Sequence, residues 1–279
     1  AQQEVRPAHS SPDPRKCKRC VPAYEKAVAY LKKNVSKASF PAKMVLGWLF
    51  LADGRYPKEL EQIVKDARNW ETRKGTHPHA QNWYPALAAL FLSEYYKYFP
   101  TVEVRESLIG LVHWFASKQE RTGGWFKWFE GAYKDRLDYA VKDLGILDCI
   151  VTGFLWTVKA QKIPVDDAML QKSDQCLLSL LTANGVSYGT GSKGSDTTGA
   201  RGAFAMLGLD YAGQTQHKLV KIYVKLVPRQ IPKLDKGHHV GAFHGLGMVL
   251  ACHRLGPQVY SELVSTWLAM VGVGGGVET

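Results

Sequence analysis

The sequence predicts an all-α protein whose helices form an α/α toroid, a closed array with an inner and an outer ring of about five to six helix pairs. Two kinds of helical segment alternate along the 279 residues, one apolar on every side and one with a polar face. The apolar segments recur every roughly 40 to 60 residues, which is typical of helical repeats. No segment shows the alternation of apolar and polar residues expected of strands.

The apolar segments are expected to form the inner ring, because a helix that is apolar all round must be enclosed by other helices. In three of them Ala or Gly recurs at close spacing: PALAALFLSEYY (85–96), ARGAFAMLGLDY (200–211) and VGAFHGLGMVLA (240–251). Small residues of this kind let neighbouring helices approach closely. The expected inner helices cover about residues 40–53, 82–98, 138–160, 196–210 and 238–255.

The segments with a polar face are expected to form the outer ring. Their apolar residues follow helical spacing, as in Leu60, Ile63 and Val64. Asp166 and Asp167 follow Pro164 and are expected to cap the start of one outer helix. The expected outer helices cover about residues 24–34, 57–71, 101–119, 165–183, 214–227 and 257–271.

The helical pattern predicts a single domain over residues 23–271, between a polar, Pro-rich tether at 1–22 and a Gly-rich tail at 272–279. The sequence begins with Ala1 rather than Met, and this start is typical of a mature end left after signal-peptide removal. We therefore expect a secreted or periplasmic protein. Artificial trimming of the chain is the alternative explanation.

The formal net charge of +11 favours anionic surfaces and ligands. Lys218, Lys221 and Lys225 form a basic stripe on one helix, which we interpret as a solvated face. A nucleic-acid-binding face would require exposed aromatic residues interleaved with the lysines, so we expect no nucleic-acid partner. No stretch approaches the roughly 20 apolar residues of a membrane-spanning helix.

The five cysteines fall into two groups. Cys17 and Cys20 form a CKRC pair that is compatible with a local disulfide, half of a metal site or free thiols. The other three lie in apolar helical segments, and we expect them to be buried small hydrophobes. They are Cys149, Cys176 and Cys252.

The loop 118–125, KQERTGGW, resembles the Q-x-x-x-G-G-W signature of the prenyltransferase and squalene-cyclase (terpenoid-cyclase) repeat. The chain resembles a degenerate member of that family over about residues 24–271, and 183–189 resembles a degenerate second copy of the loop. The resemblance implies the α/α toroid, with Gln119 capping a helix and Trp125 packed across the turn. A plain turn with a buried aromatic residue is the alternative.

The catalytic signatures of those families are incomplete. The cyclase acid D-x-D-D is absent, since only VDDA stands at 165–168. The segment 237–247, GHHVGAFHGLG, is similar to the H-x-x-x-x-x-S-G-L helix that carries the zinc-ligating His of protein prenyltransferases, and His239 falls at that position. The D-x-C ligand pair is absent, so we expect neither a metal nor a cofactor, and His239 is only a weak metal candidate.

Polar and aromatic residues gather at the predicted starts of the inner helices. In a toroid these ends converge on one rim, where unpaired backbone N–H groups favour an anion. The alternative is that the aspartates are helix caps and the histidines are satisfied polar residues at loop ends. The candidate pocket residues are His79, Asn82, Trp83, Asp138, Tyr139, Asp196, Arg201, His238 and His239.

These observations favour an exported binding or assembly module that lacks the catalysis of the family it resembles. The alternative is an enzyme acting at the rim on a polyanionic polysaccharide, as a lyase does, or on an isoprenoid or lipid. The expected ligand is an anionic or apolar small molecule.

Six outer helices against five inner ones predict a gap beside the first inner helix, at about 40–53. We expect the gap to be covered by residues 1–22 or by another protein chain, because an apolar patch of that size is rarely left to water. The apolar face in question comprises Met44, Val45, Trp48, Leu49 and Leu51.

Overall fold

The computed structural model describes residues 16, 21–73, 80–125, 145–187, 189, 201–232 and 241–270. Within these residues the chain forms eleven α-helices, two short 3-10 helices and one pair of two-residue strands. The prediction of an all-α protein with negligible strand content is therefore confirmed for the described part of the chain.

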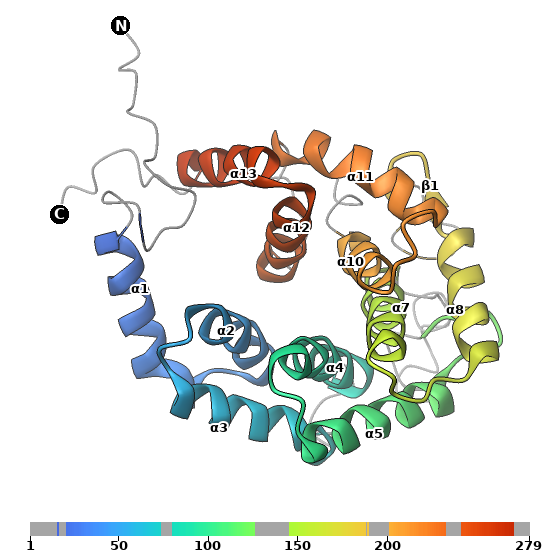
Figure 1. The fold of residues 1–279 in the computed structure, drawn as a ribbon, viewed down its shortest axis with the longest axis horizontal. Helices are drawn as coiled ribbons and strands as arrows, with labels where there is room; N and C mark the ends of the chain where they lie inside the picture. Colours follow the sequence, from blue (N-terminus) through green and yellow to red (C-terminus); the bar gives the residue numbers. More distant parts are fainter. Residues whose placement is uncertain are drawn as a thin grey trace, which may run out of the picture.

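Five helices lie inside an arc made by the other helices (Figure 1). Each inner helix packs against the next one along the chain, and the last contacts the first over a smaller area. These five are the helices expected from the apolar segments. They are α2 (Phe40–Asp53), α4 (Ala80–Tyr98), α7 (Gly145–Ala160), α10 (Ala203–Tyr211) and α12 (Gly241–Leu255).

The outer arc runs in chain order from α1 to α13 (Figure 1). A hairpin of β1 (Leu181–Thr182) and β2 (Gly185–Val186) stands where the second copy of the loop signature was expected. The 3-10 helices are η1 (Val35–Lys37) and η2 (Trp70–Arg73). The outer helices are α1 (Val21–Asn34), α3 (Pro57–Arg68), α5 (Val102–Lys118), α8 (Asp167–Ser179), α11 (Lys218–Gln230) and α13 (Pro257–Met270).

Local signals in the sequence fix where several helices begin and end. Thr101 and Asp166 cap α5 and α8, and the Asp166 carboxylate accepts from the Ala168 N–H at 2.7 Å. The expected capping role of Asp166 is confirmed. Gly54 ends α2 in a left-handed conformation (φ 76°), which favours glycine.

The inner helices are enclosed as their composition predicts. All but three residues of α7 are buried, whereas α3 buries one stripe that includes Leu60, Ile63 and Val64. Met44 on α2 was expected on an open face but is only 2% exposed, because it points into the core.

The closest helix contact joins α7 and α10. A Cβ atom on Gly208 would lie 2.1 Å from the carbonyl oxygen of Gly153, and one on Gly153 would lie 2.3 Å from that of Phe204. Both distances are far below van der Waals contact. The two backbones therefore touch, as the small residues of the apolar segments suggest.

Gly208→Ala should destabilise the protein by about 1–3 kcal/mol, because the added methyl group must push two backbones apart. Chemical denaturation measures the change. Gly110→Ala on α5 is the matched control, since a Cβ there meets nothing within 4 Å. The control should be neutral, or stabilising by up to about 1 kcal/mol. Equal effects of the two substitutions would contradict the close packing.

The turn after α5 ties three helices together. The Gln119 side chain donates from Nε2 to the carbonyls of Gly123 and Met169, both at 2.9 Å, and so joins this turn to α8. Trp125 donates from its backbone N–H to Asp148 on α7 (2.8 Å) and from its indole to the Phe115 carbonyl on α5 (2.9 Å). Trp125 is fully buried, and its ring stands edge-on to Phe115.

Trp125→Ala should lower the free energy of unfolding by about 3–5 kcal/mol, because it removes a fully buried aromatic ring. Tyr30→Ala, at a position 66% exposed, is the control and should change it by less than about 0.5 kcal/mol. A loss below about 1 kcal/mol at Trp125 would reject its packing role.

A carboxylate at the end of α2 anchors α1. Asp53 accepts hydrogen bonds from the Tyr24 hydroxyl and from Arg55, whose Nη2 lies 2.8 Å from Oδ2, and Arg55 also reaches Glu25 at 3.0 Å. The hydrogen bonds from Arg55 are the main cause that lowers the pKa of Asp53 from 3.8 to about 2. Burial raises the pKa of Tyr24 to about 12, and its bond to Asp53 adds to the effect.

Because the pKa of Asp53 is lower in the folded state, the ionised carboxylate stabilises the fold. This contribution to the free energy of unfolding is complete above about pH 4 and is lost as the pH falls toward 2. The contribution is about 2 kcal/mol. Asp53→Asn should remove it at neutral pH and flatten the stability curve between pH 4 and 2. Glu106→Gln on the exposed face of α5 is the control. Parallel urea titrations that show the same acid slope for the protein and for Asp53→Asn would contradict this assignment.

Candidate functional site

A cavity of about 210 Å³ opens among the inner helices. Its lining comes largely from the later turns of α4, α7, α10 and α12, together with Trp48 of α2. The C-terminal ends of helices far apart in the sequence therefore meet around one space.

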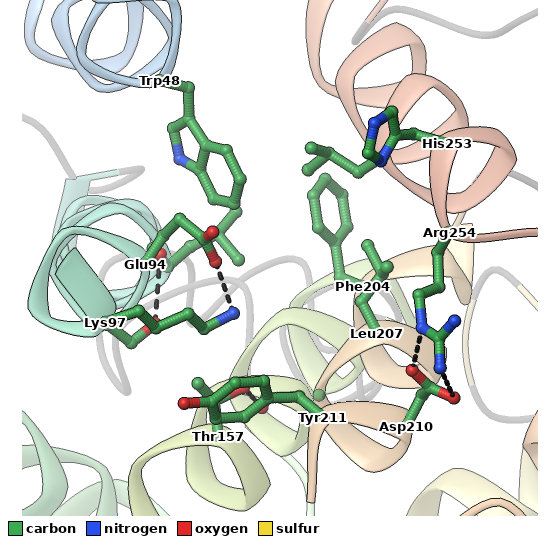
Figure 2. Close-up of a pocket in the computed structure, with 15 residues that line it drawn as sticks. Trp48, Glu94, Lys97, Thr157, Phe204, Leu207, Asp210, Tyr211, His253 and Arg254 are labelled. Atoms are coloured by element: carbon green, nitrogen blue, oxygen red, sulfur yellow. Dashed lines mark hydrogen bonds and ion pairs between the residues drawn. The ribbon is translucent and has the colours of Figure 1, made fainter. Parts of the chain in front are cut away.

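Apolar side chains form the walls of this cavity. The Trp48 side chain extends into the cavity from α2, and Phe204 and Leu207 line the cavity from α10 (Figure 2). Leu90 and Leu250 add aliphatic surface from α4 and α12. Gly153 and Gly208 also line it, so the close contact of α7 and α10 bounds the cavity as well.

Two ion pairs stand on different sides of the opening (Figure 2). Glu94 and Lys97 pair within α4 at 2.5 Å. Asp210 of α10 pairs with Arg254 of α12, and its second oxygen lies 3.1 Å from Nη2 of the guanidinium. The four charges balance one another, so the cavity does not require a charged ligand.

Cationic side chains suit this end of the helices. Helix C-termini carry partial negative charge, which Lys97 at the end of α4 and Arg254 at the end of α12 complement. The Lys97 ammonium also lies 4.0 Å from the centre of the Tyr211 ring, within the range of a cation–π contact. Tyr211 is 44% exposed and lines the cavity.

The rim predicted from the sequence lies at the opposite ends of these helices. Asn82 and Trp83 lie in the first turns of α4, where Asn82 is buried and Trp83 half-buried, and Arg201 lies just before α10. The cavity of Figure 2 is not lined by any of these three residues. The grouping at the rim remains a prediction, because the other candidates lie outside the described residues: His79, Asp138, Tyr139, Asp196, His238 and His239.

Arg201 belongs to a buried polar layer between α10 and the hairpin. Its guanidinium donates to the Val186 carbonyl at 3.0 Å. The Tyr223 hydroxyl accepts from the backbone N–H groups of Val186 (2.9 Å) and Gly202 (3.1 Å). These bonds satisfy backbone groups buried between the two layers, which would otherwise destabilise the fold.

The described cysteines are buried, as expected for small hydrophobes. Burial raises the pKa of the Cys149 thiol well above its ordinary value, and the charge of Asp148 adds to the effect. Cys149 is therefore a thiol rather than a nucleophilic thiolate at neutral pH. Cys17 and Cys20 lie outside the described residues.

Across the described ranges, no group of three or more His, Cys, Asp or Glu side chains is arranged to hold a metal ion. His239, the weak metal candidate, lies outside those ranges. None of the helices that the structure describes is both long and apolar enough to cross a membrane.

A family model described as "Domain of unknown function (DUF6288)" matches residues 23–271. The chain belongs to the DUF6288 family. The match covers the single domain expected from the helical pattern. No curated protein and no solved structure matches the chain.

The sequence of this DUF6288 chain does contain a signal for the cavity, which lies at the opposite helix ends from the predicted rim. Polar and aromatic residues follow apolar residues near the ends of three inner segments, as Glu94 to Lys97, Asp210 to Tyr211, and His253 to Arg254. Their equivalent positions in successive repeats place them at one end of the molecule. Comparing helix ends as well as helix starts would have found them.

Proposed function

We propose that this chain is a small-molecule binding module of the α/α-toroid class, related to the prenyltransferase and squalene-cyclase repeat and lacking the catalysis of that family. The cavity among the inner helices is the observation that carries the proposal. The arc of outer helices around five inner helices supports the toroid class (Figure 1). The Gln119–Trp125 turn, with its capping Gln and buried Trp, supports the relationship. A secreted or periplasmic location remains a prediction.

The shape and lining of the cavity define the ligand. Its volume of about 210 Å³ is below the roughly 300–1,000 Å³ of sites for drug-sized ligands. Trp48, Phe204 and Leu207 offer apolar and aromatic contact, and polar groups stand at the opening. We therefore propose a compact, largely apolar ligand of one or two rings, or a short branched chain, with one polar group near the opening.

The charged groups around the cavity favour binding over acid–base chemistry. Glu94 and Asp210 are each held by a cation of the chain itself, Lys97 and Arg254 respectively. Each carboxylate thus has its partner within the chain, and proton transfer to or from a ligand would first require that ion pair to break.

Titration calorimetry with 2-naphthol, a two-ring probe with one hydroxyl group, tests the proposal. We expect a Kd between about 10 µM and 1 mM, the range set by the small number of atoms in the probe. Leu207→Trp should fill the cavity and weaken binding at least tenfold, with the melting temperature little changed.

Val224→Trp is the matched control, because Val224 is 44% exposed on α11 and does not line the cavity. This variant should bind the probe as the unsubstituted chain does. If neither substitution alters binding, or if the probe does not bind at all, the cavity is not a ligand site of this kind.

A further inference from the structure

A second hollow lies between the first two helices, away from the cavity of Figure 2. This groove has a volume of about 500 Å³ and runs along the end of α1, η1 and the first half of α2. We define the α1–α2 groove by its lining residues, which are Leu31, Asn34, Lys37, Ala38, Pro41, Ala42, Val45 and Leu46.

The groove is apolar and partly open to solvent. Leu31 and Val45 are only half-buried, and Ala42 is exposed. Tyr30, next to Leu31 on α1, is 66% exposed. Val45 and Trp48 follow each other at helical spacing on α2, so the open surface continues toward the cavity.

The neighbours of α2 differ on its two sides. On one side α2 packs closely against α4, whereas on the other it meets α12 over a much smaller area. In Figure 1, α1 and α13 form the two ends of the outer arc. The α1–α2 groove is lined by the last turn of α1, by η1 and by the first half of α2. The open surface thus occurs where the succession of inner helices begins.

The charges around the groove are basic. Lys37, the one charged residue among those that line it, is exposed. The nearby Lys32 pairs with Glu59 of α3 at 3.4 Å. An occupant with acidic residues beside an apolar face would complement this edge.

We infer that the α1–α2 groove is a docking site for an amphipathic helix of another protein, one that places apolar residues in the groove and acidic residues against Lys37. A groove between two helices accepts a helix whose apolar residues recur every three to four positions. Such a helix would stand beside α2 as an additional inner element.

Charge separates this occupant from two alternatives. Residues 1–20 of the chain contain five basic and two acidic residues, so they would bring positive charge to a basic edge. A second copy carries the same net charge of +11. Both would be opposed by like-charge repulsion, whereas an acidic helix is attracted.

Fluorescence anisotropy with a labelled synthetic helix tests the inference on the full chain. The probe has about 18 residues, about five turns, with Leu on one face and Glu on the other. A second peptide carries Lys in place of Glu. We expect saturable binding of the Glu peptide and at least tenfold weaker binding of the Lys peptide.

Ala42→Glu places a charged side chain in the groove at an exposed position and should weaken binding of the Glu peptide at least tenfold. Ala116→Glu, at an exposed position of α5, is the matched control and should leave binding unchanged. Lys37→Glu should reduce the preference for the Glu peptide over the Lys peptide.

Three results would overturn the inference. The first is equal binding of the two peptides, or binding that Ala42→Glu leaves unaffected. The second is binding that appears only after residues 1–20 are deleted, which would assign the groove to the chain's own segment. The third is a dimer that light scattering detects and that Ala42→Glu dissociates, which would assign the groove to a second copy of the chain. Binding of 2-naphthol serves as a separate measurement, so failure at the groove is distinguishable from failure at the cavity.

Discussion

The backbone contact between α7 and α10 sets the spacing of the whole inner layer. Without a side chain at Gly153 or Gly208, the two helices approach until backbone atoms touch. The same pair then positions α4, which packs on α7, and α12, which packs on α10. Since both glycines also line the cavity, one steric constraint governs both the packing of the fold and the volume left open at its centre.

Buried hydrogen bonds connect this inner layer to the outer one. Asp148 of α7 holds the Trp125 backbone, and Tyr223 of α11 holds the N–H groups of Val186 and Gly202. Each bond pairs a loop group that would otherwise be buried without a partner. At these three positions the chain outside the helices is therefore fixed by specific hydrogen bonds. Hydrophobic contacts hold the two layers together, and these hydrogen bonds fix the position of one layer relative to the other.

Periodicity predicted which helices are enclosed, because burial on all sides leaves a clear compositional pattern. It did not predict which side of an enclosed helix faces which neighbour. On α2, Met44 enters the core whereas Trp48 reaches the cavity, yet both belong to one apolar segment without a polar face to orient it. The pair of Asp210 and Arg254 was also missed, since these residues are 44 positions apart and meet only through the register of two helices. The turn at Trp125 was predictable because its residues are local.

Among the described residues, the extensive helix contacts join elements that are near one another in chain order, whereas the contact of α12 with α2, the last and first inner helices, is small. A chain with this topology can order its helices one after another, since each of these contacts closes a shorter loop than the contact of α12 with α2 does. The contact between the first and last inner helices has to wait until the helices between them are in place. This contact is smaller than those between inner helices that follow each other in the chain, so it should open more readily than they do.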